Sequence, residues 1–407
     1  SQRLFWGGLL AAGAGLVGSS LVHAQDEGLV HAQDQGLDPR FEAEARKRAS
    51  AARGLAMPAE AAPCVLLTEE AWVAWLADLA LESRDRAQVA RLEGFLHALR
   101  LIPGDQSLEA ALDRVAWGGS AIVYDFAHDR FVVGPGLQNR RWRALPTFVH
   151  EAVHWVEEAR LGIAFDRRLA ELEGEDDALL AYRSLVEGTA TLATVLSLFQ
   201  ASDAPLSEVP DLSAAVRANA ALTEFAGSGD PRFGPWLDEA LVAPYADGAE
   251  FVHTLLRDMS WREFDQRVYP DPPRSMEHIL HPQKYLAGEA PIRVTLPSGL
   301  DEAVGAGWSS LGDSTSGELT LRIVAGVEAA EGWGGDRYRV YRDAAGRLLA
   351  VWVIEFDAPA DALEFARDFP HVARERTNRE RKRSVIIADP QKVLPADHLS
   401  AILALFD

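Results

Sequence analysis

The chain has 407 residues, of which 48% are hydrophobic and 25% are charged. This composition excludes a disordered or fibrous protein and supplies enough apolar material for one large domain or two smaller ones. Acidic side chains number 61 against 40 basic ones, for a formal net charge of −21. Such a charge repels phosphate backbones, so we expect no nucleic-acid partner. The one basic run, over residues 374–383, is interleaved with glutamates and is typical of a solvated helix face or loop.

Cys64 is the only cysteine of the chain. No intramolecular disulfide can form, and zinc sites built on several cysteines are excluded. Any zinc must therefore be held by histidine and carboxylate ligands. The residues around Cys64 form no nucleophile motif, so we expect a small buried apolar residue there.

The N-terminus has the features of a targeting segment. Arg3 precedes an uncharged apolar stretch over residues 4–22, and a small-x-small pattern follows that ends at Ala24. Signal peptidases cleave after such patterns, so we expect residues 1–24 to be a signal peptide, with a second cleavage point at Ala32 as an alternative. An uncleaved anchor is the competing interpretation, because the stretch approaches the length of a membrane span. We predict a secreted or periplasmic bacterial protein that has no membrane association after cleavage.

The first two thirds of the chain are predicted to be mostly helical. Residues 25–60 are polar and are expected to be a linker, with weak helical character over 41–53. Hydrophobic periodicity and β-rich runs then predict the following elements. They are helices over 69–81, 86–99 and 108–115, a β hairpin over 120–133, helices over 143–160, 176–199, 212–225 and 244–256, and a proline-rich loop over 269–297.

The pattern of predicted elements changes near residue 317. The predicted elements from there are a helix over 318–332, a hairpin of 338–341 with 348–356, a helix over 360–369, a strand over 384–388 and a final helix from 395. We therefore expect an α+β protein. A mostly helical domain over 61–315 carries a small hairpin or sheet, and a small α/β module follows over 316–407.

The chemistry is concentrated in residues 150–154, which read His-Glu-Ala-Val-His. Positions four apart share one face of a helix, so the imidazoles of His150 and His154 can bind one ion. Zinc lowers the pKa of its bound water to about 7, and Glu151 projects from the neighbouring edge to take that proton. Apolar residues flank the pair, as a buried metal helix requires. The structural alternative is a pair of core histidines with a local salt bridge.

A tetrahedral zinc site with one open position needs a third protein ligand. No second histidine motif follows His154, which excludes the metzincin arrangement. Glu187 is the best candidate, because it is the only charge between residues 183 and 203 and an unpaired buried carboxylate is costly. Gly188 and Ala190 beside it leave room for the close approach of another helix. Upstream acids are alternative ligands or groups that orient the histidines; they are Glu173, Glu175, Asp176 and Asp177.

The motif over 150–154, followed by Glu-Gly-Thr-Ala at 187–190, resembles the gluzincin pattern of zinc metallopeptidases. More narrowly, the chain is similar to a group of secreted bacterial and archaeal zincin-like proteins, and the resemblance covers roughly residues 115–370. Further signatures of that group match at 244–252, 272–285 and 332–338.

This resemblance implies a zincin-like fold with Zn²⁺ bound by His150, His154 and Glu187, and with Glu151 as the general base. Two features depart from the pattern. The spacing from His154 to Glu187 is longer than in thermolysin-like enzymes, and residues 156–159 read Val-Glu-Glu-Ala where Leu-Gln-Asp-Gln is common.

A hydrolytic zinc site usually adds a donor that stabilises an oxyanion. His281 and Tyr245 are our candidates, with Tyr285 and His278 as alternatives, and each of them can instead be a packed structural residue. The hairpin before the metal helix can bind extended substrate along an edge strand, or can be purely structural.

We therefore expect a secreted zinc peptidase that acts on a peptide or protein substrate. The alternative is a zincin-fold, zinc-binding surface protein without proteolytic activity. A cell-wall amidase is a weaker third interpretation, because those sites generally use a different ligand spacing.

Overall fold

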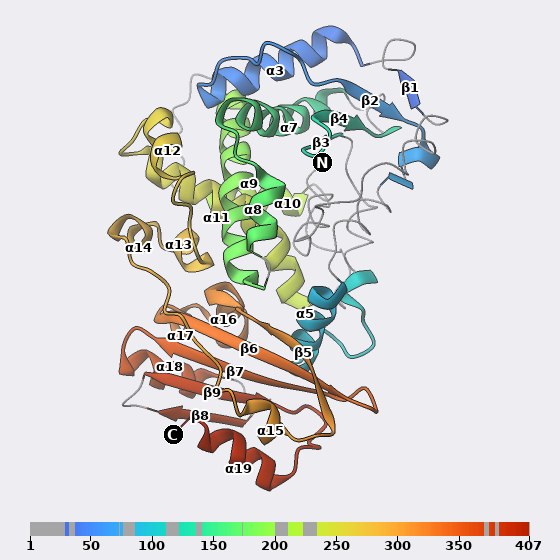
Figure 1. Cartoon of the computed structure of the whole chain (residues 1–407). Helices are drawn as coiled ribbons and strands as arrows, with labels where there is room; N and C mark the ends of the chain where they lie inside the picture. Colours follow the sequence, from blue (N-terminus) through green and yellow to red (C-terminus); the bar gives the residue numbers. More distant parts are fainter. Residues whose placement is uncertain are drawn as a thin grey trace.

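The computed structural model describes residues 29–31, 37–72, 74–75, 86–110, 122–135, 141–172, 174–199, 211–222, 234–369, 374–378 and 382–406. The predicted signal peptide and both cleavage points lie outside these residues. No helix in the described stretches is both long and apolar enough to cross a membrane. A helical half that carries a small sheet is joined to a half built on a larger sheet (Figure 1). The protein is α+β, as the sequence predicts.

The smaller sheet forms around the predicted hairpin. Its strand order is β1-β2-β4-β3, in which β3 and β4 are the antiparallel hairpin and β2 runs parallel to β4. The bounds are Leu29–His31 for β1, Cys64–Leu67 for β2, Ile122–Asp125 for β3 and Arg130–Val133 for β4. Buried residues of the sheet, among them Ile122 and Phe131, pack on Phe148 and Ala152 of α7 (Arg141–Leu161). The hairpin therefore lies beside the helix that carries residues 150–154, as predicted.

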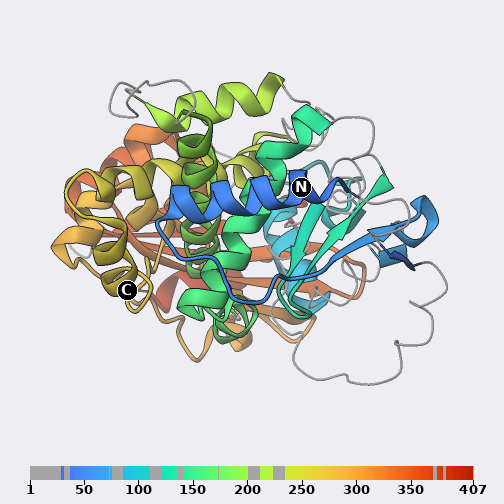
Figure 2. The same cartoon turned by 90° about the horizontal axis from the view of Figure 1, so that it is seen from above.

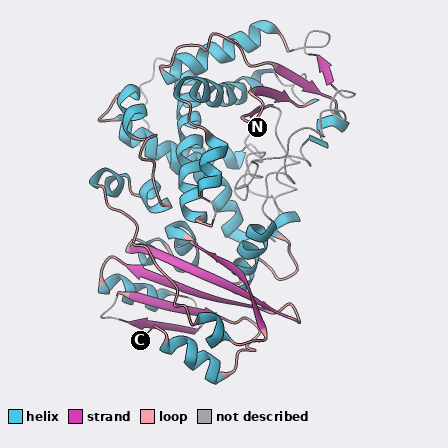
Figure 3. Ribbon diagram, in the orientation of Figure 1, coloured by secondary structure: helices cyan, strands magenta, loops and turns pink. Residues whose placement is uncertain are grey.

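Helices fill the space between the two sheets (Figure 3). The longer ones are α5 (Arg86–Ala98), α9 (Asp176–Phe199), α10 (Leu212–Leu222) and α11 (Gly234–Leu256). The central α9 packs against α7 and α11. Both α7 and α9 follow the predicted periodicity, but α11 begins at Gly234 rather than at Pro244. Proline removes one backbone hydrogen bond within a helix, and the packing of α11 along α9 offsets that loss.

Residues 37–60 do not form the linker that the sequence predicts. They contain α3 (Pro39–Arg53), in which the side chain of Asp38 accepts a hydrogen bond from the Arg40 N–H at the first turn. Gly54 ends the helix in the left-handed conformation that glycine adopts without strain. The helix packs on α7 and α9 (Figure 2, blue), and Arg53 is completely buried. This segment is therefore part of the folded helical half.

Short helices form in several segments for which the sequence predicts no helix. They are α8 (Phe165–Glu171), α12 (Trp261–Arg267), α13 (Met276–Leu280), α14 (Pro282–Ala287) and α15 (Leu300–Val304). The predicted proline-rich loop over 269–297 contains two of them. Ser275 caps α13 and Pro282 opens α14. Such single turns are too short to leave a hydrophobic period in the sequence.

The C-terminal half is an antiparallel sheet of order β5-β6-β7-β9-β8. The bounds are Trp308–Ser314, Trp333–Asp343, Leu348–Phe356, Arg383–Ala388 and Arg374–Asn378 in that order. Alternate residues of β7 face opposite sides, so Val351 packs towards α19 (Ala396–Ala404) and Trp352 towards α5. Helices α16 (Gly317–Ala325), α17 (Val327–Ala330) and α18 (Pro359–Asp368) also belong to this half.

Three predictions for this half need correction. The boundary at residue 316 is wrong as a division of the core, because β5 precedes it and pairs with β6. The predicted helix over 318–332 is broken at Gly326, whose φ of 95° is outside the helical range. The basic run begins with the edge strand β8 rather than a helix face or loop. The sequence of β8, Arg-Glu-Arg-Thr-Asn, has no apolar residue, as is typical of an edge strand that avoids further pairing.

Candidate metal centre

Three predicted ligands converge where α7 meets α9. His150 Nε2 lies 3.0 Å from Glu187 Oε2, and the Nε2 atoms of His150 and His154 lie 3.2 Å apart. The third separation, from His154 Nε2 to Glu187 Oε2, is 3.7 Å. All three residues are buried, with exposed fractions of 4% or less. The structure therefore brings the three residues into one compact group.

These separations fit a tetrahedral zinc site. Zn–N and Zn–O bonds of roughly 2.0–2.1 Å at tetrahedral angles place neighbouring ligand atoms roughly 3.3 Å apart. The observed distances of 3.0, 3.2 and 3.7 Å bracket that value. In addition, Glu187 Oε1 is buried and has no hydrogen-bond partner among the described residues. Two imidazoles and one carboxylate are also a donor set that zinc prefers.

The charges of the three side chains depend on one another. Burial opposes ionisation of Glu187, but hydrogen bonds and positive charge from His150 and His154 outweigh it and lower the pKa of Glu187 to about 2. Burial opposes protonation of His154, and Glu187 outweighs this effect and raises the pKa of His154. The group therefore holds an ionised carboxylate beside the imidazole of His154, which favours a proton. A metal ion competes with that proton for the same lone pairs.

Glu151 is buried beside the three side chains and contacts the small sheet. Its Oε2 accepts a hydrogen bond of 2.8 Å from the backbone N–H of Tyr124 in β3. Burial raises the pKa of Glu151, against the attraction of His150 and His154. The contact gives Glu151 a structural role that the sequence does not reveal. Its presence alone therefore no longer separates a catalytic site from a purely metal-binding one.

Tyr245 of α11 also belongs to this site. Its ring centre lies 6.0 Å from that of His150, and its side chain is 2% exposed. Burial and then the charge of Glu187 raise the pKa of Tyr245 well above its usual value. The phenol therefore stays protonated and can act as a hydrogen-bond donor. Arg183, one turn before Glu187 on α9, is a further buried charge close to both residues.

His281 does not join this group, contrary to the predicted role as an oxyanion donor. Its Nε2 lies 2.9 Å from Glu318 Oε1 and 3.1 Å from a guanidinium nitrogen of Arg322, both in α16. His281 thus links the α13–α14 corner to the C-terminal half. The two alternative donors have structural partners as well. Tyr285 donates to the carbonyl of Asp271, and the His278 Nε2 lies 2.7 Å from the carbonyl of Glu289.

The alternative acidic ligands serve the junction between the two halves. Glu175 pairs with Arg337 of β6, and Asp176 accepts hydrogen bonds from Gln88, Arg91 and Tyr338. Asp177 accepts one from the backbone of Met276. Glu173 lies outside the described residues. Within the described part of the chain, the second group of acids with metal-like spacing is Glu277, Glu289 and Asp357, and Lys284 already pairs with all three.

A buried network that the sequence does not reveal lies next to the three candidate ligands. Arg53 of α3 forms an ion pair with Glu157, which lies one turn after His154 on α7. The second oxygen of Glu157 accepts a hydrogen bond of 3.2 Å from Thr189, two positions after Glu187 on α9. The network therefore joins the three helices at the level of the site. A charged residue three positions after His154, on the same helix face, is the one signal that the sequence offers.

Comparison with known proteins gives one match. A family model described as a domain of unknown function, DUF8575, matches residues 279–395. No curated protein and no solved structure matches the chain. The matched range covers the C-terminal sheet and its helices from α14 to α18, and it does not include His150, His154 or Glu187. Interpretation of the metal centre therefore depends on its own geometry.

Proposed function

We propose that this protein is a secreted zinc peptidase, with Zn²⁺ held by His150, His154 and Glu187. The observation that carries the proposal is the set of three ligand atoms separated by 3.0, 3.2 and 3.7 Å in a buried site. The secreted location rests on the N-terminal sequence pattern, and the substrate class on the resemblance to gluzincins. A peptide or protein is the corresponding substrate.

Each residue at the site has a role in this proposal. A bound Zn²⁺ ion supplies Lewis-acid activation of water and of a peptide carbonyl. Glu151 is the general base, and the upward shift of its pKa by burial brings it closer to the operating pH, as proton transfer requires. Tyr245 stays protonated and can donate a hydrogen bond to the oxyanion that develops from the carbonyl. These roles place one base and one donor beside the same three ligands.

A zinc-binding protein without proteolytic activity is the second candidate. It is favoured by the burial of the whole site, since Glu151 is 1% exposed and already bonded to Tyr124 of β3. One carboxylate oxygen of Glu151 is therefore already used in a structural contact. The ligand set is the same in both candidates, so metal content alone cannot separate them.

Metal analysis combined with a peptide-library assay separates the two candidates. We expect the wild type to bind one zinc and to cleave peptides, and Glu151→Gln to retain zinc and lose cleavage. Glu158→Gln is the matched control, because Glu158 lies two turns along the same helix and bonds to the backbone of Ala164 instead. Zinc binding without cleavage by the wild type supports the non-proteolytic candidate. Absence of zinc from the wild type contradicts both.

A further inference from the structure

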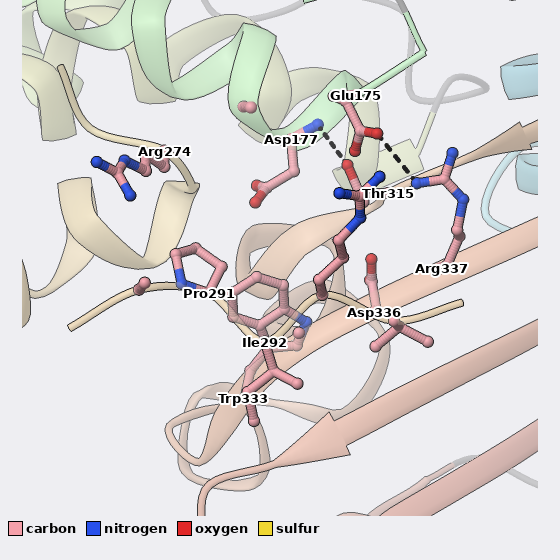
Figure 4. Close-up of a pocket in the computed structure, with 14 residues that line it drawn as sticks. Glu175, Asp177, Arg274, Pro291, Ile292, Thr315, Trp333, Asp336 and Arg337 are labelled. Carbon is pink, nitrogen blue, oxygen red and sulfur yellow. Dashed lines mark hydrogen bonds and ion pairs between the residues drawn. The ribbon is translucent and has the colours of Figure 1, made fainter. Parts of the chain in front are cut away.

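A cavity of about 250 Å³ lies between the start of α9, residues 290–294 and β6 (Figure 4). It is separate from the metal centre. Asp177 in its wall precedes Glu187 by ten positions on α9, a distance of roughly 15 Å along a helix. Its volume is below the roughly 300–1,000 Å³ of pockets for drug-sized ligands, so an occupant must be small.

The Asp177 carboxylate points into this cavity, towards Pro291 and the Trp333 indole (Figure 4). Its side chain is 4% exposed and accepts a single hydrogen bond, of 3.1 Å, from the backbone N–H of Met276. No arginine, lysine or histidine in the described ranges forms an ion pair with it. A buried carboxylate without a cation is costly unless hydrogen bonds replace its water. Asp177 therefore retains unused capacity to accept hydrogen bonds.

The other acids that line the cavity are already satisfied. Asp336 accepts hydrogen bonds from Ser316, Gly317 and the indole N–H of Trp352. Glu175 pairs with Arg337. Both acids therefore have donors inside the protein. Asp177 differs from them in having one backbone donor alone.

The backbone makes room for this unpaired carboxylate. Gly317 packs directly against Asp177, and a Cβ at that position would overlap Asp177 Oδ1. The φ of Gly317 is also +75°, which glycine adopts without strain. The carboxylate thus occupies a space that any other residue at position 317 would fill.

An independent feature of the wall is the indole of Trp333. Its Nε1 is buried, the side chain is 2% exposed, and no described residue accepts its hydrogen. Buried N–H groups almost always have a partner. The cavity therefore offers a ligand one hydrogen-bond acceptor, the Asp177 carboxylate, and one donor, the N–H of Trp333. Groups of the described residues do not satisfy either of them fully.

We propose that this cavity binds a small primary amine that also carries a hydrogen-bond acceptor. The ammonium group pairs with Asp177, the acceptor takes the N–H of Trp333, and the short carbon chain lies against Pro291 and Ile292.

A calcium ion fits less well, because it takes 6–8 oxygen ligands and two of the three acids in the wall, Glu175 and Asp336, already have donors. The wall also contains three arginines: Arg337 pairs with Glu175, Arg274 pairs with Asp271, and Arg293 is exposed. This ligand site is independent of the proposed zinc chemistry.

Titration of the full chain with 4-aminobutan-1-ol tests the proposal, with butane-1,4-diol as the neutral probe of the same length. We expect calorimetry or ligand-observed NMR to give a Kd on the order of 1 mM or better for the amine and no binding of the diol. Asp177→Asn keeps the acceptor for Met276 and should weaken amine binding at least about tenfold, the loss expected for about 1.4 kcal/mol. Glu175→Gln, at the same cavity, should leave it unchanged.

Trp333→Phe provides a second test, because it keeps an aromatic ring and removes the N–H together with the five-membered ring that carries it. We expect severalfold weaker binding of the amine and a lower Tm, since the smaller ring leaves space at a buried position. The proposal is overturned if the amine does not bind the wild type, if the diol binds equally, or if Asp177→Asn and Trp333→Phe both bind the amine as the wild type does. Binding of Ca²⁺ that competes with the amine would instead identify a metal site.

Discussion

Gly188 of α9 and Gly248 of α11 meet backbone to backbone. A Cβ on Gly188 would overlap the backbone of Gly248, and a Cβ on Gly248 would overlap the carbonyl of Ser184. This close approach places Tyr245, one turn before Gly248, beside Glu187, the neighbour of Gly188. The sequence-based expectation that Gly188 leaves room for a second helix is confirmed. The pair of glycines therefore sets the spacing between the third ligand and the phenol.

Gly188→Ala should consequently damage both stability and metal binding. The added methyl group must push α11 away, and such overpacking costs typically about 1–3 kcal/mol. We expect a lower Tm and less zinc retained in a calibrated chelator competition. Gly104→Ala is the control, because nothing lies within 4 Å of a Cβ at that position. If both substitutions leave Tm unchanged, the two helices are not in contact as described.

Replacing Glu157, a buried partner of Arg53, should lower both stability and zinc affinity. Glu157→Gln leaves the buried guanidinium of Arg53 with Asp265 as its remaining carboxylate partner. We therefore expect a loss of stability below the roughly 3–5 kcal/mol of a buried charge left without any partner. Because Thr189 also loses a charged acceptor, we expect zinc affinity to fall about 10–100-fold, as for residues that orient ligands.

Arg48→Met is the comparison for this variant. It removes the partly exposed pair with Glu44, and such surface pairs contribute about 0–1 kcal/mol. Chemical denaturation should show a larger loss for Glu157→Gln than for Arg48→Met. Equal small losses would mean that the Arg53 pair does not hold the helices together.

The convergence of His150, His154 and Glu187 was predictable from the sequence because it depends largely on local spacing. Two histidines four positions apart share a helix face, and Glu187 is the only charge after Arg183 in the helix that the structure confirms over Asp176–Phe199. The position of His281 was not predictable in this way. Its partner Glu318 lies 37 positions along the chain in a helix of the other half, and no periodic pattern connects the two.

Strand β5 is likewise an element of the fold that the local sequence does not predict. Its sequence Trp-Ser-Ser-Leu-Gly-Asp-Ser lacks the alternation of apolar and polar residues that predicts a strand. It is a strand because β6 supplies a partner, with a register shift between Ser310 and Gly312. Tertiary pairing therefore decides its structure, and the predicted domain boundary was misplaced for that reason.

His154→Ala should abolish stoichiometric zinc binding. The substitution removes a ligand atom that lies 3.2 Å from His150 Nε2 and leaves two ligands, fewer than a stable zinc site needs. Metal analysis of the purified protein after dialysis checks the result. His128→Ala is the control, because that histidine is exposed and pairs with Asp125 in the hairpin turn. Wild-type zinc content in the His154 variant would make the ligand assignment wrong.

Glu187→Gln tests the third ligand more finely. The amide keeps the size of the side chain and loses the charge that balances Zn²⁺, so affinity should fall by more than the roughly 10–100-fold of a supporting residue. Competition with a calibrated chelator on both proteins measures the difference. If Glu187 serves mainly to neutralise nearby Arg183, stability falls slightly and zinc affinity stays the same. Equal zinc affinity of the wild type and the Glu187→Gln variant would contradict the proposal that Glu187 is the third ligand of a gluzincin-type site.

Asp177→Asn should raise stability at neutral pH even though it removes the proposed amine site. Burial is the main cause that raises the pKa of Asp177 well above 3.8, and the like charges of Asp336, Glu277 and Glu318 add to it. Because the folded state binds the proton more tightly than the unfolded state, the wild type gains stability as pH falls from the folded pKa towards about 4. Each unit of that shift is worth about 1.4 kcal/mol.

The Asp177→Asn variant has no carboxyl group at this position, so this dependence of stability on pH is absent from it. Its advantage over the wild type should therefore be largest at pH 7 to 8 and should shrink towards zero near pH 4, which denaturation across that range measures. Glu175→Gln is the control, since its partner Arg337 holds it as an ion pair at the surface of the same cavity. A variant that is less stable than the wild type at high pH would show that a cation inside the protein already pairs with Asp177.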